Sequence, residues 1–435
     1  MNNKIKLRTP GYYKNFHCIS SECKDNCCVG GWQIDIDEET AEYYSTVNGD
    51  FGKKLRDNID YDNLCFRLKD GKCPFLDNNN LCGIYKELGE EHIGIVCDQF
   101  PRFTEYFGNV KERGIGLACE EAAKIILTDR SNFSYSETDT DEDVFDDSEF
   151  DSSLADMLML LRDEFMYVIE KTDYTFNQKM IIIINIAADF QNHINNNDYN
   201  SMNKLYKKIK QHDFNSCFIS DFRQISFNEL EQNMASVWYA YLELETLGDE
   251  WPDFTDKIMD FLHPENSNAS ENNEHGSMKI QYNQAFEEYT KYLNSYYAEN
   301  ASENNEHGSM KIQYNQAFEE YTKYLNSYYA ENTSELENIL KYYIFRYLLK
   351  ASYDHDLFGK IQLAAANIAI LRDMEIYRFI QNGNNFSSDD RMDIIHIFSR
   401  EVEYSEDNLE TLAEEFIFDD IFKSENIIKL FNFSY

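Results

Sequence analysis

The distribution of cysteine constrains this chain of 435 residues more than any other feature of its sequence. Nine of the ten cysteines lie within the first 119 residues, and the rest of the chain holds only Cys217. Thiols that merely fill a hydrophobic core would be spread more evenly. Because thiolates bind soft metals and iron–sulfur clusters, this pattern predicts a compact inorganic site in the N-terminal quarter.

The spacing of the N-terminal thiols suits loops that present several sulfurs to one centre. The first group runs Cys18-x4-Cys23-x3-Cys27-Cys28. The later thiols lie in CPFLDNNNLCGIY, VCDQFPRF and GLACEEAA, as Cys73, Cys82, Cys97 and Cys119. Distant thiols of this kind can close a site once the chain has folded. Cys65 falls outside these motifs and is predicted to be a bystander, and Cys217 is predicted to be a helix-core thiol.

Three known kinds of site fit the spacing poorly. A zinc ribbon has two CxxC knuckles, and the sequence has none. A radical enzyme that uses S-adenosylmethionine usually has C-x3-C-x2-C, but here Gly30 stands where the third cysteine would be. A Rossmann-type methyltransferase has a glycine-rich loop between a strand and a helix, and neither Gly114-Ile-Gly116 nor Gly30-Gly31 has that context. A purely structural metal site remains an alternative.

The N-terminus and the apolar runs predict a cytoplasmic protein. The first residues, MNNKIKLRTPGYYKNF, have no apolar stretch of the kind found in secretory signals. Apolar runs such as Met180–Ile184 are far too short to span a bilayer, so no membrane association is expected. In a reducing compartment, metal binding is a more frequent use of clustered thiols than disulfide formation.

The formal net charge of −39 argues against nonspecific binding to nucleic acid, whose phosphates would be repelled. The same charge would suit a protein substrate that presents lysines. It can equally reflect solubility, or a composition rich in Asn, Ile and Tyr.

The composition divides the chain into three parts. Residues 1–130 are Cys-rich and predict a small metal-cluster domain of short helices and loops. Residues 131–153 predict a solvated acidic linker, because nine of the eighteen residues from 136 to 153 are acidic and none is basic. Residues 154–435 repeat apolar positions at steps of three and four, as in LADMLMLLRDEFMYVIEK, NELEQNMASVWYAYLELETL, LENILKYYIFRYLLKA and IQLAAANIAILRDMEIYRFI. The predicted fold is mainly α, with the Cys-rich domain followed by an all-α helical bundle.

A segment of 32 residues occurs twice without a change, at 269–300 and again at 301–332. Each copy predicts a polar loop and one amphipathic helix. Two copies are too few for a solenoid, which needs about three repeats to bury a core. We therefore interpret the repeat as a recent tandem duplication or an assembly error. After it, Ser334-Glu-Leu-Glu337 has capping-box spacing and predicts the start of a helix.

These motifs, in this order, resemble two related families. C-x3-CC, CPFL, LCxIY and CxxFPR are similar to the cysteine-cluster proteins of the YkgJ type, which are thought to hold zinc or iron. The longer blocks GYYKNFHCISSECKDNCCVGGWQIDID, CPFLDNNNLCGIYKELGEE, VCDQFPRF and LACEEAAKIIL resemble the bacterial flagellin lysine-N-methylases. The resemblance covers residues 8–127 well and residues 335–410 loosely. The tandem repeat departs from the family pattern.

The resemblance implies a protein-lysine N-methyltransferase that uses S-adenosylmethionine to methylate ε-amines of surface lysines on flagellin. It also implies a 4Fe–4S cluster, with zinc as the alternative metal. Eight thiols inherit the ligand positions: Cys18, Cys23, Cys27, Cys28, Cys73, Cys82, Cys97 and Cys119. This number exceeds the four that one cubane cluster needs, so either a second site exists or some thiols are structural.

Methyl transfer places demands on residues near the cysteine motifs. A lysine amine must lose its proton before it attacks a sulfonium methyl group, and Asp98, Glu120 and Tyr85 are the predicted catalytic groups. Arg102 could hold the carboxylate of the methyl donor or neutralise cluster charge. Trp32 could stack on adenine. The competing hypothesis is a non-catalytic metal-cluster or redox scaffold whose helical domain recruits partners.

Overall fold

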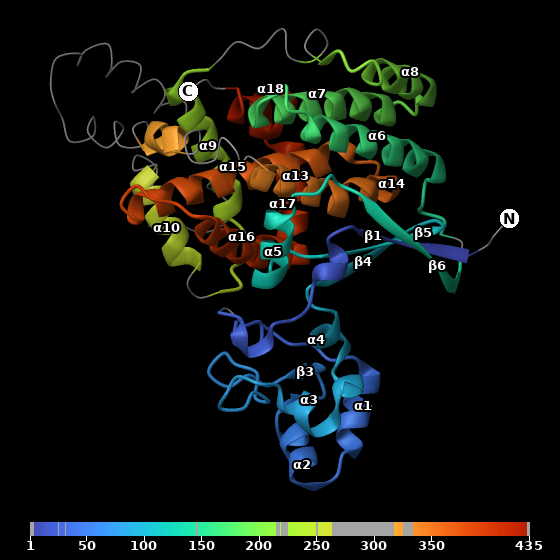
Figure 1. Cartoon of the computed structure of the whole chain (residues 1–435), viewed down its shortest axis with the longest axis vertical. Coiled ribbons are helices and arrows are strands. Elements are labelled where there is room, and N and C mark those ends of the chain that lie inside the picture. Colours follow the sequence, from blue (N-terminus) through green and yellow to red (C-terminus); the bar gives the residue numbers. More distant parts are fainter. Residues whose placement is uncertain are drawn as a thin grey trace.

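The computed structural model describes residues 4–24, 26–30, 32–144, 147–214, 218, 225–248, 251–262, 317–324 and 334–432. Helices account for most of this part of the chain. They pack into a layered bundle that lies over a small sheet, and a cysteine-rich unit lies on the other side of that sheet (Figure 1). The prediction of a mainly α fold is confirmed. The fold alone does not show the predicted metal cluster.

The bundle begins after the acidic segment and is centred on one long helix. Its helices are α6 Ser152–Glu170, α7 Phe176–Asn195, α8 Tyr199–Ile209, α9 Phe227–Leu242, α10 Trp251–Leu262, α13 Ser334–Tyr347, α14 Ala351–Asp354, α15 Leu357–Gln381, α16 Ser388–Glu403, α17 Glu406–Phe418 and α18 Ser424–Ile427. The central helix α15 packs against α7, α10, α13, α16 and α17, and apolar residues along most of its length are buried. The four segments with helical periodicity correspond to α6, α9, α13 and α15, as predicted.

Side-chain caps explain where several of these helices begin. Thr175 and Gln178 form a capping box at the start of α7, and Ser387 and Asp390 form another at the start of α16. Helix α13 begins at Ser334, where the sequence predicted a helix start. The Glu337 carboxylate in its first turn pairs with the buried Lys179 Nζ at 2.5 Å and thereby ties α13 to α7.

A four-stranded sheet lies under the bundle, in the order β4-β5-β1-β6. Its strands are β1 Lys4–Pro10, β4 Arg102–Phe107, β5 Val110–Ile115 and β6 Tyr135–Asp143. Strand β1 runs parallel to β5 and antiparallel to β6, and β4 runs antiparallel to β5.

Strand β6 lies in the segment that the composition predicted as a linker. Basic residues of β1 face acidic residues of β6: Arg8 pairs with Glu137 at 2.7 Å, and Lys4 pairs with Asp143 at 2.8 Å. Cross-strand pairs of opposite charge support an antiparallel pairing even where apolar alternation is weak. The acidic stretch is therefore a paired edge strand over Tyr135–Asp143.

The cysteine-rich unit combines short helices with loops. Its elements are α1 Glu38–Thr46, α2 Gly49–Asp57, β2 Ile59–Asp60, β3 Cys65–Phe66, α3 Gly83–Leu88 and α4 Ile95–Gln99. Helix α5 Glu120–Thr128 follows after the sheet strands and packs against α13 and α16 of the bundle. Short 3₁₀ turns lie at Tyr13–Asn15, Ser20–Glu22 and Glu90–His92.

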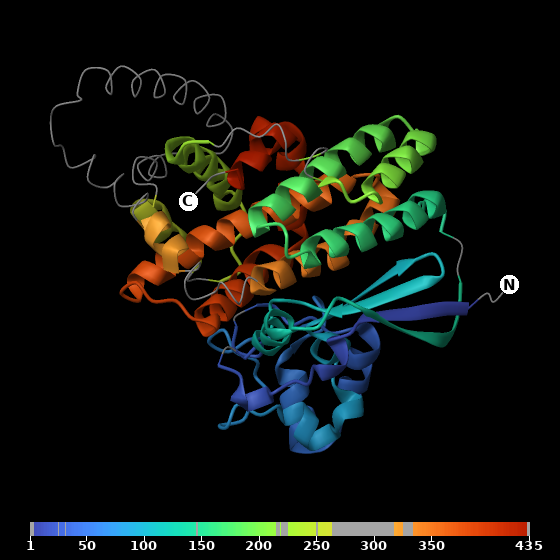
Figure 2. The same ribbon diagram turned by 45° about the horizontal axis from the view of Figure 1, so that its top comes forward.

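Two separate hydrophobic cores underlie this arrangement. The small core of the cysteine-rich unit is built from buried residues between Ile34 and Ile84, among them Leu55 and Phe75. The large core is that of the bundle, and it includes residues of β5 and α5 such as Ile115. The sheet and α5 thus pack with the bundle, while the small unit projects below them (Figure 2).

Several sequence predictions lie outside the described residues. The first copy of the tandem repeat, 269–300, is among these, and only residues 317–324 of the second copy are described. Cys217 is outside as well. Among the helices that the structure describes, none is long and apolar enough to cross a membrane.

Candidate metal centre and adjoining pocket

Three of the predicted ligand thiols meet where the first cysteine motif passes the CPFL motif. The Cys73 main-chain N–H donates to the Cys28 carbonyl at 2.8 Å and fixes the two segments side by side. The Cys28 thiol shares hydrogen bonds with Cys27 and Cys73. The hydrogen bond with Cys27, assisted by burial, raises the pKa of Cys28 far above that of a free thiol, and the hydrogen bond with Cys28 does the same for the buried Cys73.

Two further thiols approach this trio from α3 and α4. Cys82 caps α3, and its sulfur accepts a hydrogen bond from the Tyr85 main-chain N–H at 3.5 Å. Cys97 lies on α4, and the residue as a whole has an exposed surface. Its thiol group is nevertheless close to many protein atoms. The resulting loss of hydration, together with the neighbouring Cys73 and Cys82, raises the pKa of Cys97 to about 12. We call these five residues the main thiol group: Cys27, Cys28, Cys73, Cys82 and Cys97.

The other three predicted ligands lie around the start of α5 and are called here the α5 thiol group: Cys18, Cys23 and Cys119. The Cys23 thiol donates to Glu120 Oε2 at 3.3 Å, and the Lys24 main-chain N–H donates to the same oxygen at 2.9 Å. Burial raises the pKa of Cys119, and the nearby Cys18 adds to this effect. The eight thiols that the sequence placed in one set therefore divide into two groups.

The donor chemistry of the main thiol group fits a soft metal or an iron–sulfur cluster, because thiols are the ligands that such centres prefer and five of them lie in one neighbourhood. The arrangement itself is not a formed coordination shell. Within the part of the chain that the structure describes, no three Cys, His, Asp or Glu side chains are arranged so that they could hold a metal ion. The structure thus brings soft ligands into one neighbourhood without placing them around a common point. Cys65, the predicted bystander, lies on β3 near Asp35 and Asp60.

The three predicted catalytic residues lie in different surroundings. Glu120 begins α5, is partly buried and lines a pocket. Tyr85 is half exposed on α3. Asp98 is exposed on α4, where its carboxylate accepts a hydrogen bond from the Gln99 side chain. The pocket at Glu120 is therefore the place to look for a catalytic role among the three.

The two predicted cofactor-binding residues take part in local packing. The Arg102 guanidinium lies 5.1 Å from the centre of the Phe16 ring, and it donates to the Asp98 carbonyl at 2.9 Å. The Trp32 indole N–H donates to the Cys27 carbonyl at 2.6 Å, and its ring packs edge-on against Phe100. These contacts are all with other protein groups, so a role of Arg102 or Trp32 in binding the methyl donor stays a prediction.

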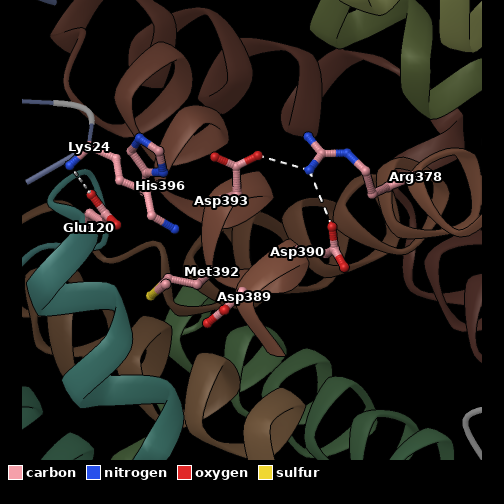
Figure 3. A pocket seen from close by; sticks show the side chains of 8 residues that line it. All are labelled: Lys24, Glu120, Arg378, Asp389, Asp390, Met392, Asp393 and His396. Carbon is pink, nitrogen blue, oxygen red and sulfur yellow. Dashed lines mark hydrogen bonds and ion pairs between the residues drawn. The ribbon is translucent and has the colours of Figure 1, made fainter. Parts of the chain in front are cut away.

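The pocket at Glu120 has a volume of about 260 Å³ and lies between the cysteine loops and the bundle. Its lining side chains come from the loop before Cys27, from α5, from the end of α15 and from α16 (Figure 3). They are Lys24, Glu120, Arg378, Asp389, Asp390, Met392, Asp393 and His396.

Carboxylates dominate this pocket. Four of its side chains are acidic, while Lys24 and Arg378 are the basic ones. The Arg378 guanidinium is held by two of the acids, with Asp393 at 2.8 Å and Asp390 at 3.6 Å. The lining therefore has an excess of negative charge next to the α5 thiol group.

Sequence reasoning missed the contribution of α16 to this pocket. Asp389 and Asp390 stand in its first turn, where acidic residues are common because they favour the positive end of the helix dipole. The sequence signal was therefore that of an ordinary helix start.

Comparison with known proteins finds one family model and several relatives. The model of the FliB lysine N-methylase C-terminal domain matches residues 294–430. A lysine-N-methylase of Salmonella typhimurium (strain LT2) and one of Salmonella choleraesuis (strain SC-B67) are each 30% identical over 143 residues, which is 31% of this chain and 35% of the relative. The matched stretch thus spans about a third of the length of these two relatives.

A shorter relative is covered more completely. The flagellar biosynthetic protein FliU of Salmonella muenchen is 30% identical over 135 residues, which is 29% of this chain and 79% of FliU. No solved structure matches the chain. The family model and these relatives agree with the resemblance carried by the cysteine motifs, and the chain belongs to the flagellin lysine-N-methylase family.

Proposed function

We propose that this chain is a protein-lysine N-methyltransferase that methylates ε-amines of surface lysines on flagellin in the cytoplasm, with S-adenosylmethionine as the methyl donor. The observation that carries the proposal is the family membership, because relatives that match the chain bear the name lysine-N-methylase. The name of FliU supports a flagellar protein as the target.

The acidic pocket is the place that we assign to the substrate lysine. Its four carboxylates exceed its two basic groups, so the local field favours a cationic side chain. The apolar part of Met392 offers contact for the methylene stem of a lysine, while Glu120 offers an acceptor for its amine. The pocket lies beside Cys23 of the α5 thiol group, whose thiol donates to Glu120.

The reaction requires a free amine. The lysine ammonium first gives a proton to a base, and Glu120 is the predicted group in the pocket. The amine nitrogen then forms a bond to the methyl carbon while the bond between methyl and sulfur breaks. The electron pair leaves with sulfur as a neutral thioether, and the second amine proton passes to the base or to water.

The main thiol group is proposed to hold a 4Fe–4S cluster, or zinc as the alternative metal. A metal bound there would supply a Lewis-acidic or redox-active centre. The residues of this chain have the other tasks: Glu120 accepts a proton, the aspartates of α16 attract the lysine, and Arg102 is proposed to bind the donor carboxylate.

The proposal is tested by the intact mass of the host flagellin, co-expressed anaerobically with this chain and compared with flagellin alone. We expect the mass to rise in methyl-sized steps. In a purified assay, Glu120→Gln should lower the initial rate about a hundredfold, the scale of a lost general base. The matched control is Glu121→Gln, since Glu121 neighbours Glu120 and only makes a long ion pair with Lys124 at 3.9 Å.

Replacement of Cys27 and Cys28 by Ala should abolish the mass increase if the main thiol group is needed. A flagellin mass that stays unchanged while the chain is folded and loaded with metal would contradict the methylase proposal. That result would favour the metal-cluster scaffold instead. Equal rates for the Glu120→Gln and Glu121→Gln variants would remove Glu120 from the mechanism while leaving the activity in place.

A further inference from the structure

Three aromatic rings join the cysteine loops to the bundle. Trp32 follows the Cys27–Cys28 pair, Phe100 follows Cys97, and Tyr404 follows the last residue of α16. Ring centroids are 5.2 Å apart for Trp32 and Phe100, 5.5 Å for Phe100 and Tyr404, and 6.3 Å for Trp32 and Tyr404. Aromatic pairs at these separations attract each other beyond simple area burial.

Hydrogen bonds connect the same three segments through their main chains. The Tyr404 hydroxyl donates to the Pro101 carbonyl at 3.3 Å, and the Gly116 main-chain N–H donates to that carbonyl at 2.8 Å. The Trp32 indole N–H donates to the Cys27 carbonyl at 2.6 Å. The segment of Cys27 is therefore bonded to Trp32, whose ring packs against Tyr404. The segment that follows Cys97 is bonded to Tyr404 directly, through the Pro101 carbonyl.

The bundle holds Tyr404 from behind by a buried charge pair. The Arg346 guanidinium lies 5.4 Å from the centre of the Tyr404 ring and 3.2 Å from Glu403 Oε2. The buried Glu403 carboxylate also accepts hydrogen bonds from the hydroxyls of Tyr342 at 3.0 Å and Tyr347 at 2.8 Å. A charge pair whose carboxylate is satisfied by several donors has few alternative arrangements, so it fixes the direction of Arg346.

The space around the Tyr404 hydroxyl is also limited on the side of the sheet. A Cβ added to Gly116 would lie 2.3 Å from the Tyr404 oxygen and 3.3 Å from an Arg346 nitrogen. The Tyr404 ring is therefore bounded by Arg346 on one side and by Gly116 on the other, and its hydroxyl is directed at the Pro101 carbonyl.

We infer that Tyr404 is a positioning residue through which the helical domain sets the relative placement of two segments, the loop that carries Cys27–Cys28 and the short helix α4 with Cys97. These segments come from distant parts of the cysteine-rich unit, and neither is part of a long element of its own. Any centre that uses thiols from both needs a fixed separation between them. Tyr404 supplies this constraint from outside the unit, whichever group the protein transfers.

The test compares site-selective alkylation by iodoacetamide in the metal-free full chain, measured by peptide mass spectrometry. Tyr404→Phe removes the bond to Pro101 but keeps the ring, and Tyr404→Leu removes both. The matched control is Tyr353→Phe, because the Tyr353 hydroxyl also donates from the bundle to a sheet carbonyl, that of Tyr106 at 2.7 Å.

We expect alkylation of Cys27 and Cys97 to rise about fivefold in Tyr404→Phe, which corresponds to one lost hydrogen bond, and further in Tyr404→Leu. Cys65 serves as the internal reference, and its rate should stay constant in all variants. The control variant should resemble the wild type at every thiol, and its urea midpoint should equal that of Tyr404→Phe.

Two outcomes would overturn the inference. The first is a rate at Cys27 and Cys97 that remains within about twofold of the wild type in both Tyr404 variants. The second is a rise at Cys65 as large as that at Cys97, since this would mean general loosening instead of a local displacement of the two segments. Neither outcome depends on methyl transfer, so a failure of the proposed function would be separate from a failure of this inference.

Discussion

A buried ion pair between the sheet and the bundle gives the most direct test of how this fold is held together. Arg162 on α6 and Glu112 on β5 form two parallel hydrogen bonds of 2.8 Å and 2.6 Å, and both side chains are almost completely buried. The Arg162 guanidinium also faces the rings of Tyr135 and Phe345 at 5.0 and 5.5 Å. Burial alone would lower the pKa of Arg162, but the charge of Glu112 outweighs it and raises the pKa.

Replacing Arg162 by Met removes one partner and leaves the Glu112 carboxylate buried. Such a loss usually costs about 3–5 kcal/mol, because the remaining charge keeps its desolvation penalty without its main partner. Arg8 lies 3.4 Å from the same carboxylate and compensates part of this cost. We therefore expect Arg162→Met to lower the free energy of unfolding by about 3 kcal/mol, at the lower end of that range.

The double replacement Arg162→Met with Glu112→Leu should recover most of the loss, since two apolar side chains of similar size can fill the space without a stranded charge. Arg8 then still has Glu137 at 2.7 Å. The assay is urea unfolding followed by circular dichroism for the wild type, both single variants and the double variant. A double variant as unstable as Arg162→Met, or a single variant that costs less than about 1 kcal/mol, would refute the reasoning.

Three further predictions address the site. In the metal-free folded protein, the pKa of Cys97 is raised from 9.0 to about 12, so this thiol ionises at lower pH in the unfolded chain. The free energy of unfolding should therefore fall as the pH rises from about 9 towards 12. Thermal melts at pH 7.5 and 10 measure this, and an unchanged melting temperature would contradict it. Ser387→Ala removes a hydroxyl that accepts a hydrogen bond from the Asp390 N–H at 3.2 Å, and it should lower the free energy of unfolding in urea by about 1 kcal/mol. An unchanged free energy of unfolding would mean that this cap does not stabilise the protein. Gly116→Ala should displace the Tyr404 hydroxyl and reproduce the alkylation pattern of Tyr404→Phe, and a wild-type pattern would show that the added methyl group is accommodated elsewhere.

The helices of the bundle could be predicted because each one carries its own signal. Apolar residues recur at helical spacing through α6 and α15, and these positions are the buried ones. The sheet carries no comparable signal. Strand β1 pairs with β5 and β6, both distant in the sequence, and five of the nine residues of its partner β6 are acidic. Pairing that depends on such remote neighbours cannot be read from local periodicity.

The candidate site shows the same limit at the level of single residues. The cysteine motifs predicted a thiol cluster and left open whether a second site exists, but they did not indicate which thiols belong to which group. Cys23 and Cys27 are four positions apart, yet one hydrogen-bonds Glu120 and the other Cys28. The direction of a side chain in a loop depends on contacts that form only after folding. Glu120 was predicted as a catalytic group from its place in the motif, whereas its pocket depends on α16, far along the chain.

The aromatic and charged contacts behind Tyr404 link the two ends of this chain. The matched C-terminal segment, 294–430, contains Arg346, Glu403 and Tyr404, while the thiols of the main group all precede it. A buried ion pair is weak evidence for stability, since apolar residues could fill the same space at little cost. A guanidinium fixed by a carboxylate does have one property that apolar packing lacks, because it holds a neighbouring ring and its hydroxyl in one direction. We therefore attribute the pair of Arg346 and Glu403 to the orientation of Tyr404, whose hydroxyl it directs at the segments that carry the main thiol group.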